Sequence, residues 1–249
     1  MRIGIFDSGI GGINVLKELI KKYPNNEYIF YGDTLNLPYG SKTIEQLKEF
    51  ASNIIDFLIS NKVDLIIIAC GTISSNCYSY LKEKYNIPIY DIISPTIRYI
   101  ENSSYKSIGV IATEKTIESK IFEHNDKVKQ VKATKNFVKI IEDGIIDNHE
   151  KKEIELELDS FKNNIDALTL GCTHYPFISS IITNYLDVPV IDMGVCLTNE
   201  LNLSNEGGKQ INLYFSSINK TLKNNIRIIL NEEFSINKLV INKRSSQTL

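Results

Sequence analysis

The second half of this 249-residue chain repeats the first, and this internal repeat constrains the fold more than any other feature. The segment Val63–Thr72 aligns with Ile165–His174, and each segment has an Asp six residues before a Cys. Two further pairs align in the same order: Ile3–Ser8 with Ile108–Thr113, and Ile87–Asp91 with Val188–Asp192. Along the chain, the offsets of the three pairs are 105, 102 and 101 residues. Three matches at a nearly constant offset predict two similar lobes.

Short apolar runs alternate with amphipathic stretches up to about residue 205, which is typical of alternating strands and helices. A continuous run such as Leu65–Ile68 suits a strand that is buried on both faces. The clearest helical pattern is Thr43–Ile59, which begins with Thr43 and Gln46 at the spacing of a capping box. The predicted strands are Ile3–Phe6, Glu27–Tyr31, Val63–Ala69, Ile87–Tyr90, Ser107–Ile111, Ala167–Leu170 and Val188–Ile191. The alternation predicts an α/β fold of two similar, doubly wound parallel-sheet lobes.

The repeat also suggests where the lobes begin and end. We expect residues 1–94 plus 208–249 to form the first lobe and residues 95–207 the second, with the boundary within Ile93–Lys106. The tail adds a strand-like INLYF, a helical Lys220–Leu230 and a last strand Lys238–Ile241. The tail lacks a counterpart in the other half, so we expect it to pack on the first lobe. The final residues, Asn242–Leu249, are predicted to be frayed.

Composition narrows the classes of protein. Hydrophobic residues make up 43% of the chain and charged residues 23%, which is ordinary for a globular protein. The net charge of −2 does not suggest nucleic acid or an anionic membrane as a partner. The N-terminus lacks the layout of a signal peptide, and the apolar runs are too short to span a membrane, so a cytoplasmic location is expected.

The four cysteines have several possible roles in such a chain. A disulfide framework does not fit a cytoplasmic protein of this size, which leaves buried thiols, metal ligands or reactive thiols. Cys70 and Cys172 each stand at the carboxyl end of a predicted central strand, where open α/β sheets place their ligands. Two facing lobes would put one thiol on each side of a shared cleft. The alternative is that both are small buried residues at strand ends. Cys77 and Cys196 are interpreted as packing residues.

Polar residues gather around these two cysteines. Asp7 and Ser8 end the first strand and open a glycine-rich turn, which suits either a plain strand-to-helix turn or a phosphate loop. Thr72 follows Cys70, and Thr173 and His174 follow Cys172. A thiol reacts as its thiolate, so His174 is a candidate to exchange protons with Cys172, and Asp7 with Cys70.

The two halves differ in these helper residues. Ala112 stands where Asp7 would, and Thr72 stands where His174 would. Similar lobes with different helpers suit a reaction that is nearly symmetric but acts on mirror-image substrates. Inverting a carbon centre requires one base on each face, because a proton leaves from one side and arrives on the other.

At these residues the sequence resembles the glutamate racemase family, within the wider aspartate/glutamate racemase superfamily. The segments that carry the resemblance run in family order: IGIFDSGIGG at 3–12, YGDT at 31–34, PYG at 38–40 and GCTHYP at 171–176. Weaker matches are AC-x-T at 69–72, IAT-x-x-TI at 111–117 and FVKIIEDG at 137–144.

The resemblance implies an active site in the cleft between the lobes, with no cofactor: no pyridoxal phosphate, metal or nucleotide. It implies that Cys70 deprotonates D-glutamate and Cys172 L-glutamate, assisted by Asp7 and His174 respectively, with Glu142 an acidic residue near His174. The product D-glutamate would serve peptidoglycan synthesis. The positions expected to contact substrate are Asp7, Ser8, Tyr39, Gly40, Gly71, Thr72, Thr116, Thr173 and His174.

Two departures concern substrate choice. The family usually has Asn directly after the first cysteine, where this chain has Gly71, which offers only backbone donors. It also usually has Arg before PYG, where this chain has Asn36. These changes keep open an aspartate or broad-specificity racemase of the same superfamily.

Two further alternatives and one open property remain at this stage. One alternative is a non-catalytic binding protein on this fold, a role that includes binding to DNA gyrase for some members of the family. The other is a zinc protein that uses Cys70, Cys77, Cys172 and His174, which are permissible ligands by type. A homodimer is possible, because family members are often dimers.

Overall fold

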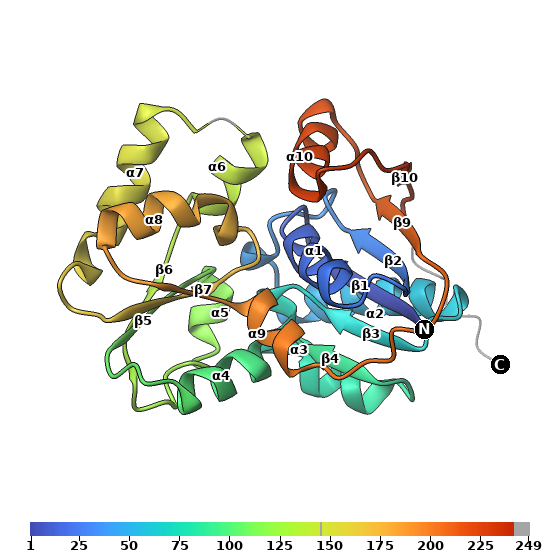
Figure 1. Ribbon diagram of the computed structural model, residues 1–249, viewed down its shortest axis with the longest axis horizontal. Coiled ribbons are helices and arrows are strands. Elements are labelled where there is room, and N and C mark those ends of the chain that lie inside the picture. Colours follow the sequence, from blue (N-terminus) through green and yellow to red (C-terminus); the bar gives the residue numbers. More distant parts are fainter. Residues whose placement is uncertain (145, 242–249) are drawn as a thin grey trace.

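A computed structural model describes residues 1–144 and 146–241, and in it the chain forms two α/β lobes that lie side by side (Figure 1). The first lobe contains a six-stranded sheet with the order β10-β9-β2-β1-β3-β4. The second contains a four-stranded sheet with the order β6-β5-β7-β8. The strands are β1 Arg2–Asp7, β2 Glu27–Gly32, β3 Leu65–Ile68, β4 Ile89–Asp91, β5 Ile108–Ala112, β6 Val128–Ala133, β7 Ala167–Gly171, β8 Val190–Asp192, β9 Gln210–Phe215 and β10 Ile236–Lys238.

The internal repeat of the sequence is a repeat of topology. The order β2-β1-β3-β4 in one sheet matches β6-β5-β7-β8 in the other, and the strands pair in parallel throughout these series. The prediction of two similar parallel-sheet lobes is therefore confirmed.

The repeated aspartates hold equivalent backbone groups in the two lobes. Asp64 accepts a hydrogen bond from the amide of Arg2 at the start of β1, and Asp166 accepts one from the amide of Ser107 before β5. Asp91 and Asp192 each accept two backbone amides from the helix that follows their strand. The matched aspartates therefore repeat because each half needs the same structural contacts.

Most predicted strands lie within two residues of the observed ones, with two exceptions. Strand β6 was not predicted, because lysines interrupt the apolar residues of its sequence VKQVKA, so a continuous apolar run is lacking. The strand lies at the edge of its sheet, where lysines are common. The last strand is Ile236–Lys238 and not Lys238–Ile241.

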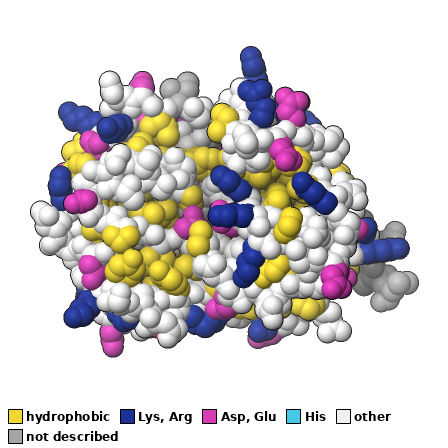
Figure 2. All heavy atoms as spheres, in the orientation of Figure 1, with side chains coloured by type: hydrophobic (Ala, Val, Ile, Leu, Met, Phe, Trp, Pro, Cys, Tyr) yellow, Lys and Arg dark blue, Asp and Glu magenta, His cyan; other side chains and the backbone are white. Residues whose placement is uncertain are grey.

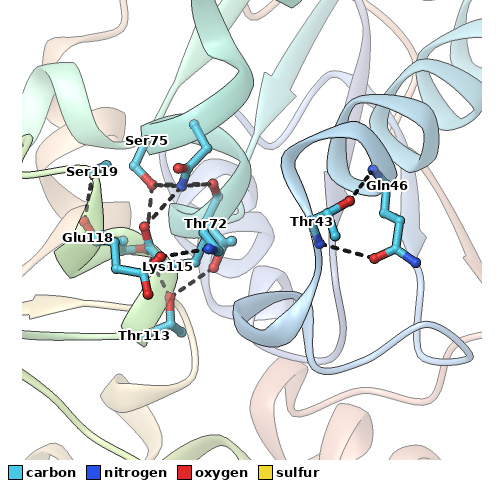
Figure 3. A network of polar contacts seen from close by, with 10 residues as sticks. Thr43, Gln46, Thr72, Ser75, Thr113, Lys115, Glu118 and Ser119 are labelled. Carbon is cyan, nitrogen blue, oxygen red and sulfur yellow. Dashed lines mark hydrogen bonds and ion pairs between the residues drawn. The ribbon is translucent and has the colours of Figure 1, made fainter.

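The helices follow the predicted alternation. Helix α2 begins with the expected capping box, in which Thr43 Oγ1 accepts from the Gln46 amide and Gln46 Oε1 accepts from the Thr43 amide (Figure 3). The helices are α1 Gly12–Lys22, α2 Ile44–Ser60, α3 Gly71–Lys84, α4 Ile93–Asn102, α5 Glu114–Glu118, α6 Phe137–Asp143, α7 Asn148–Leu158, α8 Ser179–Leu186, α9 Met193–Glu200 and α10 Lys220–Leu230.

Helices cover both faces of each sheet, which explains the continuous apolar runs in the strands. Ile5 belongs to the core under α1 and α10, whereas the next residue, Phe6, belongs to the core under α2 and α3. The core under α1 continues into the second lobe through residues of α9 and β5 such as Met193 and Val110. The two lobes therefore share one hydrophobic core, in addition to having one core each.

The tail packs on the first lobe: β9 pairs in parallel with β2, and α10 contacts α1. The boundary segment 93–106 contains helix α4, which packs against α9. The division into 1–94 plus 208–249 and 95–207 is kept as our proposal. The frayed end expected at Asn242–Leu249 lies outside the described residues.

In residues 1–144 and 146–241, no helix is both long enough and apolar enough to cross a membrane. On the face drawn in Figure 2, basic and acidic side chains are interspersed.

Candidate active site

The two lobes bring Cys70 and Cys172 to one cavity. Cys70 lies just beyond β3 and is the N-cap of α3, and Cys172 directly follows β7. Both side chains are buried, at 4% and 7% exposure. The cavity that they line measures about 20 Å³, which holds little more than one water molecule.

Most of the predicted site residues line this cavity. Asp7, Glu142 and Thr116 do not line it and lie behind the residues that do. Sequence reasoning missed four lining residues: Leu37, Pro38, Thr113 and Val138. The predicted residues at the wall are Ser8, Tyr39, Gly40, Cys70, Gly71, Thr72, Cys172, Thr173 and His174.

On the Cys172 side, the thiol, an imidazole and a carboxylate form a chain. Cys172 Sγ lies 3.7 Å from His174 Nδ1, and His174 Nε2 lies 2.7 Å from Glu142 Oε1. Burial alone would lower the pKa of His174, but its hydrogen bonds to Cys172 and Glu142 outweigh burial and hold this pKa well above its usual value. Burial would likewise raise the pKa of Glu142, yet the contact with His174 leaves it lowered. This pair is therefore an imidazolium held by a carboxylate, beside the sulfur.

On the Cys70 side, the helper is the buried carboxylate of Asp7, and the charge of His174 only partly offsets the effect of burial on its pKa. Cys70 donates to Ser8 Oγ at 3.9 Å, and Asp7 Oδ2 accepts from the amide of Gly12 at 2.7 Å. The other oxygen, Oδ1, has no hydrogen-bond partner among the described residues. Burial raises the pKa of Asp7, and burial together with the Asp7 charge raises the pKa of Cys70 well above its usual value. These shifts favour the thiol of Cys70 over its thiolate on this side of the cleft.

Asp7 and Glu142 each accept a hydrogen bond from the opposite lobe. Thr173, from the second lobe, donates to Asp7 Oδ2 at 3.3 Å. The amide of Ile10, from the first lobe, donates to Glu142 Oε1 at 3.1 Å. The side-chain amide of Asn14 also crosses the seam and donates to the carbonyl of Thr173 at 3.2 Å. The arrangement of both helpers therefore depends on how the lobes meet.

Hydroxyl groups from α3 and α5 form a second set of contacts between the lobes (Figure 3). The hydroxyl of Thr72 lies 2.9 Å from that of Thr113, which lies 3.0 Å from that of Thr116. Asn76 donates to the carbonyl of Lys115 at 3.2 Å. Thr113 is the position that the internal repeat aligns with Ser8, so the repeat contained the signal for this missed residue.

The segment before PYG forms the outer wall of the cavity. Tyr39 is buried and donates its hydroxyl to Asp33 Oδ2 at 2.7 Å, and Asn36 donates to the same oxygen at 2.8 Å. Asn36 therefore fixes the turn through Asp33, while Gly40 lines the cavity.

The remaining cysteines pack in the cores. Cys77 lies in the core under α2 and α3, and Cys196 in the core under α1. Among residues 1–144 and 146–241, no group of three or more His, Cys, Asp or Glu side chains is placed to hold a metal ion. The zinc alternative therefore lacks a ligand set in that part of the chain.

Comparison with known proteins identifies the family of this chain. The family model described as Asp/Glu/hydantoin racemase matches residues 9–201. A glutamate racemase from Aquifex aeolicus is 37% identical over 242 residues, covering 94% of this chain and 95% of that protein.

Solved structures show the same fold. A glutamate racemase from Francisella tularensis in complex with D-glutamate superposes with a TM-score of 0.84 at 31% identity, covering 96% of this chain and 97% of that one. A glutamate racemase isoform from Bacillus anthracis superposes with a TM-score of 0.88 at 26% identity, covering 95% and 96%. The chain therefore belongs to the Asp/Glu/hydantoin racemase family.

Proposed function

We propose that this chain is an isomerase that interconverts L-glutamate and D-glutamate with its own two thiols as acid and base. The observation that carries the proposal is the meeting of Cys70 and Cys172, one from each lobe, at a single buried cavity. The choice of glutamate rests on the similar proteins, which include the Francisella tularensis enzyme in complex with D-glutamate.

For L-glutamate, the thiolate of Cys172 takes the α-proton and becomes a thiol. The electron pair that is left on the α-carbon then takes a proton from the Cys70 thiol on the opposite face, which gives D-glutamate and a Cys70 thiolate. The cationic His174, held by Glu142, favours a negative sulfur at Cys172. The reverse reaction starts from the Cys70 thiolate, which forms when Asp7 takes up the proton of the Cys70 thiol.

Backbone and hydroxyl donors at the cavity suit an amino-acid substrate. Cys70 caps α3, so the amides of Gly71 and Thr72 lie at the positive end of a helix and can hold a carboxylate. We propose that Ser8, Tyr39, Gly40, Thr72, Thr173 and His174 contact the substrate directly. Thr116 acts through Thr113, to which it is hydrogen-bonded.

The cavity must enlarge for glutamate to enter, because about 20 Å³ is far too little for an amino acid. The seam between the lobes is the place where the site can open, since both sides of the cavity come from different lobes. We further propose that the product is D-glutamate for peptidoglycan in the cytoplasm and that no cofactor takes part. A homodimer stays a prediction.

The test is exchange of the α-proton in deuterium oxide, followed by NMR, without added cofactor. L-glutamate and L-aspartate would be incubated separately with the wild-type protein and with the Cys70→Ser and Cys172→Ser variants. We expect exchange and formation of D-glutamate with the wild type, and a loss of racemisation of about a thousandfold in each variant, because a serine hydroxyl is a far weaker acid than a thiol.

The other outcomes identify the alternatives. Exchange with aspartate alone would make the chain an aspartate racemase with the same two-thiol mechanism. Exchange that survives in both Ser variants would overturn the assignment of the thiols. Absence of exchange with either amino acid would contradict the proposed reaction and favour a binding protein on this fold.

A further inference from the structure

A second cavity adjoins the one that holds the thiols, and we call it the outer chamber. It measures about 260 Å³, close to the lower end of the range of about 300–1,000 Å³ for pockets that bind small ligands. Residues of both lobes line it, and it shares four of them with the thiol cavity: Pro38, Gly40, Thr113 and Val138. A substrate whose α-carbon lies between the thiols can therefore extend its side chain into the outer chamber.

The thiol cavity offers little positive charge to a second carboxylate. Glutamate carries two carboxylates and one ammonium group at neutral pH, and the amides at the start of α3 can hold one of these carboxylates. Among the described residues at the wall of this cavity, His174 is the one cationic side chain, and it is already bonded to Glu142. A cation for the side-chain carboxylate therefore has to come from outside the thiol cavity.

Lys135 is the only lysine or arginine among the described residues that line either space. It lies in the loop between β6 and α6, its side chain is exposed, and it has no hydrogen bond or ion pair with any residue that the structure describes. The lysines on the two flanking elements differ in this respect. Lys132 is paired with Glu157 at 3.2 Å, and Lys139 is paired with Asp143 at 2.7 Å. Lys135 therefore brings to the chamber a charge that the described protein groups do not neutralise.

The outer chamber also contains one acidic side chain, that of Glu114. This residue stands in the first turn of α5, where the helix dipole favours a carboxylate, so its position has a reason that involves no substrate. Glu114 and Lys135 form no ion pair with each other or with other described residues. The chamber thus presents two opposite charges, which allows the effect of each sign to be tested separately.

We propose that the outer chamber is the subsite for the side chain of an acidic amino acid, and that Lys135 determines specificity by attracting the side-chain carboxylate. This inference rests on the proposed racemase function. The side chain of the substrate takes no part in proton transfer, so this attraction is equal in the ground state and the transition state. Lys135 therefore lowers KM and leaves kcat nearly unchanged.

The test is a series of charges at position 135, with KM and kcat measured for both enantiomers of glutamate. We expect KM to rise about fivefold in Lys135→Gln and about twentyfold in Lys135→Glu, with kcat within about twofold of wild type. Lys135→Arg keeps the charge and should keep the wild-type KM. The matched control is Lys209→Gln, which removes an exposed lysine at the amino end of β9, on the sheet edge away from the thiols. This control should match wild type.

Two further measurements ask whether the effect is electrostatic and whether it depends on the side-chain carboxylate. Added KCl should raise the KM of wild type more than that of Lys135→Gln, because salt screens an exposed charge. Glu114→Gln removes the opposite charge from the chamber and should lower KM or leave it unchanged. L-glutamine has the size of glutamate but a neutral side chain, so its inhibition constant should be equal in wild type and Lys135→Gln.

Several results would overturn the inference. An unchanged KM in Lys135→Gln would show that the side-chain carboxylate does not meet this lysine. A KM in Lys135→Arg as high as in Lys135→Gln would mean that shape and not charge matters. A fall in kcat at constant KM would place Lys135 in the chemical step and contradict the subsite. An inactive wild-type protein would instead contradict the proposed racemase function, which separates the two failures.

Discussion

The two lobes share one strand order, β2-β1-β3-β4 and β6-β5-β7-β8, yet they equip their thiols differently. In the second lobe, Cys172 faces a cationic His174 that is held by Glu142. In the first lobe, Cys70 lies beside the buried Asp7, and burial together with the Asp7 charge raises the pKa of the thiol. A duplicated scaffold thus places two sulfurs in matching positions, with an imidazole held by a carboxylate beside one and a buried carboxylate beside the other.

The difference suits a reaction between mirror-image substrates. In the proposed mechanism, each enantiomer presents its α-proton to a different thiol, so the two half-reactions can use different helpers. The helpers nevertheless depend on both lobes, since Thr173 donates a hydrogen bond to Asp7 and the Ile10 amide donates one to Glu142. Closing the lobes therefore completes both sides of the site at once.

Replacing the two helper residues separates the two sides of the site directly. We expect His174→Gln to lower kcat with L-glutamate about a hundredfold and kcat with D-glutamate by less, and Asp7→Asn to show the reverse pattern. The values of kcat/KM must fall equally in both directions, because an enzyme cannot change the equilibrium. The measurement is kcat in each direction, with isotope effects from α-deuterated substrates. Equal losses of kcat in both directions for both variants would erase the distinction between the lobes.

An intermediate effect is expected for Glu142→Gln. Loss of the carboxylate lowers the pKa of His174, so the cation beside Cys172 disappears at a lower pH than in wild type. We expect activity with L-glutamate to fall about tenfold on the alkaline side, with a smaller loss near pH 6.5. The measurement is the pH profile of kcat, with Glu155→Gln on α7 as the control carboxylate. An unshifted profile would mean that Glu142 does not act through His174.

The same pair links stability to pH. Because the pKa of folded His174 is raised, its contribution to stability is full below about 6.5, the unfolded pKa, and is lost as pH rises through the folded pKa. The pKa of folded Glu142 is lowered, so its contribution is present above its unfolded pKa and is lost as pH falls through the folded value. Melting temperatures of wild type should therefore decline more than those of Glu142→Gln as the pH rises above neutrality.

The smallest effect is expected between α4 and α9, away from the thiols. Arg98 donates two hydrogen bonds to Glu200, at 2.7 and 2.5 Å, but both side chains are well exposed. We expect Arg98→Ala to cost less than about 1 kcal/mol in the free energy of unfolding by urea and to leave kcat unchanged. A clear fall in kcat would indicate that this pair controls how the lobes meet.

Most strands and the arrangement in two lobes could be predicted from the sequence. Continuous apolar runs predict buried strands such as β3, and the Thr43–Gln46 capping box predicts the start of α2. The constant offset between the halves predicted two lobes with Cys70 and Cys172 in equivalent places. These features are local or periodic, so they can be read without knowing what each segment touches. The lysine-containing edge strand β6 lacks such a pattern and was missed.

The contacts between the two lobes can be seen only in the folded structure, because they join residues from distant parts of the sequence. The contact of Thr72 with Thr113 and the hydrogen bonds from the Ile10 amide to Glu142 and from Thr173 to Asp7 all join segments that lie at least 40 residues apart in the sequence. A sequence pattern shows that a residue is buried, but it does not show which atoms face it from the other lobe. The spacing of the thiols and the proton affinity of their helpers arise from those facing atoms, and therefore only from the way the two lobes close.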